Sequence, residues 1–244
     1  MNDEITILYN AELLRRNWGL DNLSPFDLLS VAQENIENLT VLWFPMVDEV
    51  SGCCSKTKSD NIICINSRHP KGRQNFTFAH EIYHLLFDDD NDIFSCMLNS
   101  ENIIEKNADK FAEFLLIPKN ALLEFKSKND IDFWSLEDII KCEQYFQISH
   151  TALLHRLIKE DMITFNQYNE FKKGIIKHAI NLGYDAGLYQ KSEKEYYSIG
   201  KIIPLIEDAF ENDKISKGKH DEMLLNIFRS DIVYNLNDGD DLLE

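Results

Sequence analysis

His80, Glu81 and His84 have the spacing in this chain that is most directly linked to chemistry, the pattern H-E-x-x-H. In an α-helix, residues four apart lie on one face about one turn apart, so two imidazoles can bind one metal ion. Glu81 is rotated by about 100° from His80, which puts its carboxylate beside the ion as a general base for water. The spacing predicts metal-dependent hydrolysis. The alternative is an exposed helix whose histidines share a face by chance.

A hydrolytic metal site also needs a third protein ligand and an open position for water. Glu105 lies 21 residues after His84 on the next predicted helix, and Asp109 lies four residues further on the same face. This pair matches the gluzincin arrangement, in which a glutamate binds the metal and a nearby carboxylate orients a ligand histidine. Asp90 is an alternative ligand, but its geometry normally needs a glycine where this chain has phenylalanine. Glu101 is a further alternative, and the sequence favours Glu105.

The elements that must position these residues include two predicted strands. Leu39 to Phe44 and Asn61 to Asn66 are rich in β-branched and aromatic residues, with turns predicted at Ser51-Gly52 and Ser59-Asp60-Asn61. We expect a small, partly antiparallel sheet. The second strand ends just before the histidine helix, so an exposed edge there could pair with an extended peptide. The residues of that expected substrate edge are Ile62, Ile63, Cys64 and Ile65.

Three helices complete the expected catalytic region. Ser24 is a predicted N-cap, followed by Pro25, for a helix that runs to about Glu37. Residues 77–87 carry an apolar band wide enough for a nearly buried helix, which would hold the histidines rigidly. Residues 104–117 show helical spacing of apolar residues and end before a proline.

Two blocks of sequence resemble a known family. Arg73 to Leu86, RQNFTFAHEIYHLL, resembles the R-x-x-F-T-x-A-H-E-x-x-H core of the ImmA/IrrE family of metallopeptidases. Glu105 to Pro118, EKNADKFAEFLLIP, resembles the E-x-x-A-N-x-F-A-x-x-L-L-x-P block of the same family. The resemblance covers roughly residues 10–165, and two ordered blocks are more specific than H-E-x-x-H alone. The chain departs from the pattern at Asp109, where asparagine is common, and at Tyr83, where glycine is frequent.

The resemblance implies a zinc-dependent, site-specific endopeptidase of gluzincin type. Family members cut a helix-turn-helix repressor and thereby switch on stress-response or mobile-element genes. The implied site holds one Zn²⁺ per chain through His80, His84 and Glu105. Glu81 is the implied catalytic base, and Asp109 is the carboxylate that orients a ligand histidine. Zinc rather than manganese or iron is inferred from the ligand types. The alternative function is a non-proteolytic interaction protein, antitoxin-like or repressor-binding, built on the same fold without a need for Glu81.

The fold class expected from these patterns is α+β. Residues 1–125 should form a zincin-like catalytic domain, with a small sheet and the active-site helices. Residues 130–172 should form a helix-turn-helix-like helical module, and residues 173–244 a helical extension that ends in an acidic tail.

The middle module has the spacing of a DNA-binding motif without its charge. Helices predicted at Ser135 to Phe146 and His150 to Met162, with Ser149 as an N-cap, have helix-turn-helix spacing. Arg156 and Lys159 are offset by two acidic residues that follow them, so no basic stripe forms. We therefore expect packed helices that flank the groove, and the pattern argues against direct DNA binding.

The other histidines are poor candidates for metal ligands. Two of them lie five residues apart and should point to different helix faces, and the rest are isolated or lie in a charged segment. They are His150, His155, His69, His178 and His220.

Composition narrows the classes of function further. The 244 residues have a formal net charge of −17, which argues against binding to nucleic acids or anionic membranes. No apolar run is long enough to span a bilayer, and the acidic start lacks a secretory signal, so we expect a cytoplasmic protein. Its protein substrate is implied by the family resemblance. The cysteines are odd in number and scattered, as expected for reduced thiols. They are Cys53, Cys54, Cys64, Cys96 and Cys142.

Overall fold

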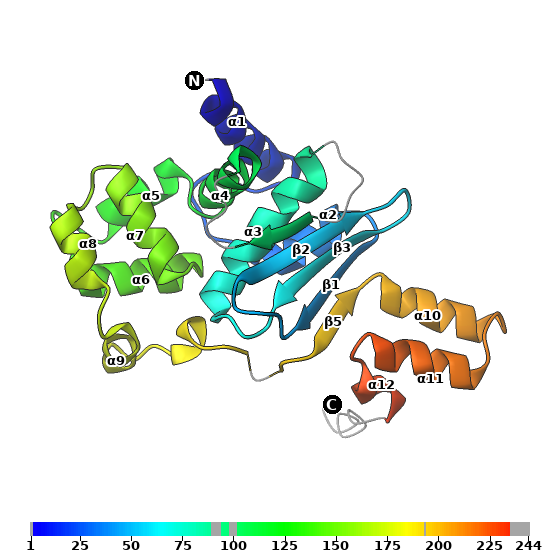
Figure 1. Cartoon of the computed structure of the whole chain (residues 1–244). Helices are drawn as coiled ribbons and strands as arrows, with labels where there is room; N and C mark the ends of the chain where they lie inside the picture. The colour runs from blue at the N-terminus through cyan, green and yellow to red at the C-terminus, as the bar shows by residue number, and fades with distance from the viewer. Residues whose placement is uncertain (1, 89–93, 98–101, 193, 235–244) are drawn as a thin grey trace.

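The computed structural model describes residues 2–88, 94–97, 102–192 and 194–234. Figure 1 shows a mixed α+β fold in which one small sheet lies between two groups of helices. The α+β class predicted from the sequence is confirmed. Within the described residues, no helix has the length and apolar character needed to cross a membrane.

The strands and helices follow one another along the whole described chain. The strands are β1 Leu39–Phe44, β2 Val50–Lys56, β3 Asn61–Asn66, β4 Phe94–Met97 and β5 Tyr197–Gly200. The helices are α1 Asn2–Asn17, α2 Leu28–Asn35, α3 Lys71–Phe87, α4 Ile103–Leu116, α5 Lys119–Lys128, α6 Leu136–Phe146, α7 His150–Lys159, α8 Phe165–Phe171, α9 Ile175–Asn181, the 3₁₀ turn η1 Ala186–Tyr189, α10 Ile202–Glu211, α11 Lys217–Asn226 and α12 Ser230–Val233.

The sheet has the strand order β4-β2-β3-β1-β5 and is partly antiparallel, as predicted. β1 and β3 run parallel, whereas the other pairs of neighbouring strands are antiparallel. The strands predicted at Leu39 to Phe44 and Asn61 to Asn66 are both present. The predicted turn at Ser51-Gly52 is wrong, because both residues belong to β2 and extend the hairpin with β3.

The predicted substrate edge is also wrong. β3, which contains Ile62, Ile63, Cys64 and Ile65, pairs with β2 on one side and with β1 on the other. Its backbone N–H and C=O groups are therefore used within the sheet and cannot accept an added strand. The outer strands of the described sheet are β4 and β5.

The C-terminal part contains a strand where the sequence predicted only helix. β5 pairs antiparallel with β1, with Tyr197 opposite Trp43 and Gly200 opposite Thr40. The segment is short and has few apolar residues, so its periodicity is weak and the pairing with β1 determines its conformation. The helices α10–α12 then pack on their own small core of Ile206, Leu224 and Ile227, which also contacts Leu42 of β1.

The predicted helix near residue 24 begins later than expected. Its N-cap is Asp27, whose side chain accepts hydrogen bonds from the amides of Leu29 and Ser30. Ser24 is held in a different turn, because its amide donates to Asp21 and its carbonyl accepts from the buried guanidinium of Arg15. The first helical residue is therefore Leu28.

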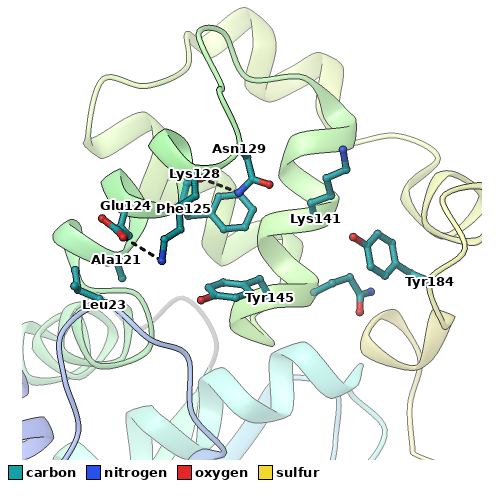
Figure 2. A pocket seen from close by; sticks show the side chains of 10 residues that line it. Leu23, Ala121, Glu124, Phe125, Lys128, Asn129, Lys141, Tyr145 and Tyr184 are labelled. Atoms are coloured by element: carbon teal, nitrogen blue, oxygen red, sulfur yellow. Dashed lines mark hydrogen bonds and ion pairs between the residues drawn. The ribbon is translucent and has the colours of Figure 1, made fainter.

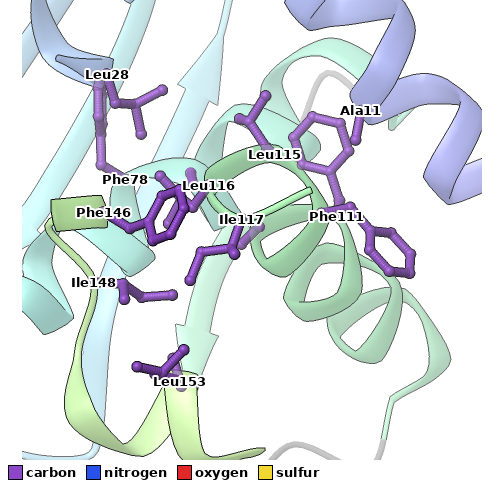
Figure 3. Close-up of a cluster of buried hydrophobic side chains, with 14 of the residues drawn as sticks. Ala11, Leu28, Phe78, Phe111, Leu115, Leu116, Ile117, Phe146, Ile148 and Leu153 are labelled. Atoms are coloured by element: carbon purple, nitrogen blue, oxygen red, sulfur yellow. The ribbon is translucent and has the colours of Figure 1, made fainter. Parts of the chain in front are cut away.

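The main core joins the helices on which the site depends. α4 packs against both α1 and α3, and its buried residues Phe111 and Leu115 have no exposed surface. Burying such a side chain contributes roughly 1.5–3 kcal/mol, so this contact fixes α4 relative to α3. Figure 3 shows the same cluster reaching Phe146 and Ile148 at the turn between α6 and α7.

The helices of the middle module lie where the sequence placed them. α6 begins with a capping box at Ser135, and α7 begins after the predicted N-cap Ser149, which accepts a hydrogen bond from the amide of Ala152. Gln147 between them has a left-handed conformation. Whether the pair acts as a helix-turn-helix motif stays a prediction.

Candidate metal centre

Helix α3 presents both histidines of the motif from a buried position. It begins after Pro70, which cannot donate a backbone hydrogen bond and therefore suits a helix start, and it is buried from Thr77 to Leu85. The ring of Phe111 on α4 packs against the rings of Tyr83 and Phe87 of α3, at 5.4 Å and 5.2 Å between centroids. This aromatic contact holds the two helices together beside the histidines.

Three predicted ligands converge between α3 and α4. The Nε2 atoms of His80 and His84 lie 3.1 Å apart. The carboxylate of Glu105 lies 3.3 Å from Nε2 of His80 and 3.5 Å from Nε2 of His84. Among the described residues, these three form the one group that could hold a metal ion.

The separations of these donors fit a tetrahedral metal site. Donors bonded to zinc at about 2.0–2.1 Å in a tetrahedron lie roughly 3.3–3.4 Å from one another. The three observed separations of 3.1, 3.3 and 3.5 Å bracket that value. Two imidazoles and one carboxylate also form a donor set typical of zinc and leave one position open for water. The residues therefore fit the group that the sequence implied.

Each ligand histidine is oriented by a carboxylate on its other ring nitrogen. Nδ1 of His80 donates to Oδ1 of Asp109 at 2.8 Å, which is the contact that the sequence predicted. Nδ1 of His84 donates to Oδ2 of Asp88 at 2.5 Å. Both contacts turn Nε2 toward the shared centre and fix the tautomer that can bind a metal.

Asp88 is a functional residue that sequence reasoning missed. It begins a run of three aspartates that directly follows Phe87, the last residue of α3. Its position four residues after His84 on the same helix face is the signal that could have found it. The alternative ligands Asp90 and Glu101 lie outside the described residues.

The two histidines differ in their affinity for protons. Burial alone would lower the pKa of His80, but its contacts with Asp109 and Glu105 and the charge of Glu81 outweigh burial and raise the pKa to about 10. The pKa of His84 is lowered, because burial and the positive charge of His80 together exceed the effect of Asp88. His80 then donates through Nε2 to the neutral His84. A metal that binds here must displace a proton from His80.

Glu81 lies on the side of α3 that faces the sheet and has no exposed surface. A Cβ atom placed on Gly52 of β2 would lie 2.9 Å from Oε1 of Glu81 and 2.7 Å from a methyl carbon of Thr77. The absence of a side chain at this position therefore leaves room for the carboxylate. On the same face, burial and then the charge of Glu81 raise the pKa of the Cys54 thiol.

A cavity of about 680 Å³ opens onto the metal centre. Its walls come from α3 and α4 on one side and from α7, α9 and η1 on the other. The polar residues that line it include His80, Glu105, Asp109, Glu113, Arg73, Ser149, His150, His155 and Tyr189, and the apolar ones include Phe76, Ile175, Ile176 and Leu188. His80 and Glu105 of the metal centre thus line a cleft between α3 and α4 on one side and α7, α9 and η1 on the other.

The wall opposite the metal centre contains a buried acid that the sequence did not reveal. Glu143 of α6 is fully buried, and its two oxygens accept hydrogen bonds from Nδ1 of His150 and from the hydroxyl of Tyr189. Nε2 of His150 donates to the carbonyl of Phe171. His150 and Tyr189 line the cavity, so Glu143 fixes two of its polar residues from behind. The sequence indicated only that His150 is a poor candidate for a metal ligand.

A second pocket of about 480 Å³ lies away from the metal centre (Figure 2). The rings of Phe125, Tyr145 and Tyr184 face it from α5, α6 and the segment after α9. Its one carboxylate, Glu124, is paired with Lys128 at 3.1 Å. None of the predicted site residues lines this pocket.

The comparison with known families agrees with this geometry. The family described as Peptidase_M78, IrrE N-terminal-like domain, matches residues 45–158, which span the chain from just before β2 to the last turn of α7. None of the curated proteins compared with the chain matches it. Residues 45–158 therefore match an IrrE N-terminal-like domain, which supports the resemblance of this chain to the ImmA/IrrE family of metallopeptidases.

Proposed function

We propose that this protein is a zinc-dependent, site-specific endopeptidase. The observation that carries the proposal is the convergence of His80, His84 and Glu105 to tetrahedral donor separations beside a cleft, with Glu81 on the helix of the two histidines. The match of residues 45–158 to a metallopeptidase family supports the same reaction. A zinc ion bound there would act as a Lewis acid toward the scissile carbonyl and the attacking water.

The residues of the chain divide the remaining work between them. Glu81 accepts a proton from the attacking water and passes it to the leaving amine, and its position between α3 and β2 keeps the carboxylate away from bulk solvent. Asp109 and Asp88 hold the imidazoles at a fixed orientation. The two walls of the cleft bind a peptide segment and admit only substrates that fit between the helices.

We further propose a helix-turn-helix repressor as the substrate. The family resemblance supports this class of partner, and the charge of the chain supports it independently. A DNA-binding protein carries a basic surface, and a protein of net charge −17 attracts such a surface over a long range. Cleavage of the repressor would then derepress stress-response or mobile-element genes.

The test is co-expression of this chain with the product of a neighbouring repressor-like gene. Wild-type protein should convert the repressor into two fragments, and Glu81→Gln should leave it intact. Metal analysis of both purified proteins should give close to one zinc per chain, because Glu81 is not among the converging donors. Cleavage by a zinc-loaded Glu81→Gln protein would refute the assignment of Glu81. Repressor inactivation without cleavage by either protein would support the non-proteolytic alternative.

A further inference from the structure

Two cysteines lie directly opposite each other in the central hairpin of the sheet. Cys53 of β2 is the register partner of Cys64 of β3 in an antiparallel pair. Opposite residues in such a pair have Cα atoms about 4.5–5.5 Å apart. A disulfide needs Cα atoms roughly 4.4–6.8 Å apart, so the strand register places the backbones of these two residues within the range that a disulfide requires.

The same pair differs from the other described cysteines in its exposure. Cys53 and Cys64 are half-buried, whereas Cys54 and Cys142 are buried. Successive residues of a strand point to opposite faces, so Cys54 turns toward α3 while Cys53 turns to the other face of the sheet. Cys53 and Cys64 are therefore partly exposed on the face of the sheet away from α3.

The two thiols are also unequal in acidity. A hydrogen bond from Cys64 lowers the pKa of Cys53 to about 7. The pKa of Cys64 is raised by the same contact and by burial. A thiolate is the attacking species in thiol–disulfide exchange, so Cys53 attacks first and Cys64 reacts second.

We propose that Cys53 and Cys64 form a site of reversible disulfide modification that is oxidised by a low-molecular-weight disulfide such as oxidised glutathione. The sulfur of Cys53 attacks one glutathione sulfur, forms a mixed disulfide and expels the first glutathione thiolate. Cys64 then loses its proton to solvent, attacks the sulfur of Cys53 and expels the second glutathione. Two protein thiols are oxidised and one glutathione disulfide is reduced to two thiols, so atoms and electrons balance.

This site lies directly behind the proposed catalytic base. Gly52 and Cys54, the neighbours of Cys53 in β2, both face Glu81. A covalent link from Cys53 to β3 fixes the part of β2 on which that carboxylate packs. The effect on catalysis rests on the proposed function, whereas formation of the disulfide does not.

The experiment uses the full-length protein, reduced, freed of reductant and incubated at neutral pH with oxidised glutathione. The intact mass should fall by about 2 Da, the mass of two hydrogen atoms. Two of the five thiols should become unreactive. Trypsin should release residues 17–56 linked to residues 59–68, and a reductant should separate them. No cleavage assay is needed, so failure of the proposed function would leave this result unaffected.

Variants assign the bond, because residues 17–56 contain both Cys53 and Cys54. Cys54→Ala should keep the linked peptides, and Cys53→Ala or Cys64→Ala should lose them. Cys54→Val serves the same purpose if the alanine variant does not fold. Three results would each overturn the proposal. They are a peptide link that persists in Cys53→Ala, a wild-type protein that stops at the glutathione adduct, and an unchanged number of reactive thiols.

Discussion

At the scale of single residues, the site consists of pairs in which a carboxylate orients a histidine through a hydrogen bond. Asp109 and Asp88 each accept a hydrogen bond from Nδ1 of a ligand histidine, which leaves both Nε2 atoms turned to the centre. Partners of this kind typically change metal affinity by 10–100-fold when they are removed. The strength of the metal site is therefore set partly by residues that never contact the ion.

Asp109→Ala should weaken zinc binding by about 10–100-fold, because His80 loses its orienting acceptor. Asp109→Asn should bind zinc much more like the wild type, since an amide oxygen also accepts a hydrogen bond from the imidazole. Competition with a chromophoric chelator measures both affinities. Equal losses in the two variants would show that charge, rather than orientation, is the contribution of Asp109.

Gly52→Ala should reduce the rate of substrate cleavage while leaving one zinc bound. The added Cβ would approach Oε1 of Glu81 to 2.9 Å and the carbonyl of Cys64 to 2.8 Å, so the base or the strand must shift. Gly218→Ala is the matched control, because nothing lies within 4 Å of its Cβ and alanine favours a helix by about 0.5–1 kcal/mol. Steady-state cleavage and metal content are the measurements, and unchanged kinetics in Gly52→Ala would contradict the close packing.

Cys53 should react with iodoacetamide with a pH midpoint of about 7, well below the value of about 9 for an ordinary thiol. Below this midpoint the sulfur is a protonated and unreactive thiol, and above it the sulfur is a nucleophilic thiolate. Cys64→Ala removes the hydrogen bond that lowers the pKa, so its midpoint should move upward. Rates are read from the alkylated peptide by mass spectrometry. A midpoint that does not respond to Cys64→Ala would contradict the assigned cause.

Sequence reasoning located the converging donors because all of them obey local rules of helix spacing. His80 and His84 lie one turn apart on α3, and Glu105 and Asp109 lie one turn apart on α4. Gly52 could not be found in this way, because its importance arises from contact with a residue 29 positions away. Nothing in the sequence indicates that β2 packs against the base.

At the scale of elements, the predictions failed where a strand depends on its partners. The sequence located β3 correctly but made it an edge, because the pairing of β3 with both β1 and β2 is decided by contacts across the sheet. β2 was partly read as a turn, since Ser51-Gly52 is typical of turns and Val50 is the one β-branched residue of the strand. Helices α3 and α4 were predicted well because their apolar periodicity is contained within each segment.

Gly200→Ala should destabilise the protein through the pairing of β5 with β1. Gly200 has a φ of +108°, a conformation that strains residues with a side chain, and its Cβ would collide with the carbonyl oxygen of Leu39. Strain of this kind costs about 1–3 kcal/mol. Urea denaturation should show a lower midpoint with unchanged zinc content, because the metal donors lie on α3 and α4. An unchanged midpoint would mean that β5 contributes little to the fold.

At the scale of the whole molecule, the C-terminal part completes a sheet that begins near the other end of the chain. β5 lies along the edge of β1, as Figure 1 shows. The small core of α10–α12 packs against Leu42 of β1. The three metal donors lie on α3 and α4, and none of them lies on β5 or α10–α12. The C-terminal part therefore contributes to the sheet, whereas the metal donors lie between residues 80 and 105.

A chain that ends at residue 192 should still bind one zinc but should self-associate and bind an apolar dye. It lacks β5 and α10–α12, so the edge of β1 and the side chain of Leu42 become exposed. A chain that ends at residue 234 keeps these elements and is the control. Size-exclusion chromatography and dye fluorescence distinguish the two. A monomeric, dye-free protein ending at 192 would refute this role of the C-terminal part.

The pairing of Thr40 with Gly200 also has a consequence for the order in which the protein can fold. These partners are about 160 residues apart, whereas β2 and β3 meet through a short turn and can pair locally. At about 5–20 residues per second, a ribosome needs roughly 10–30 s after β1 to synthesise β5. During that time β1 has an unpaired outer edge, so the newly made chain has a long interval in which chaperones or neighbouring chains can bind it.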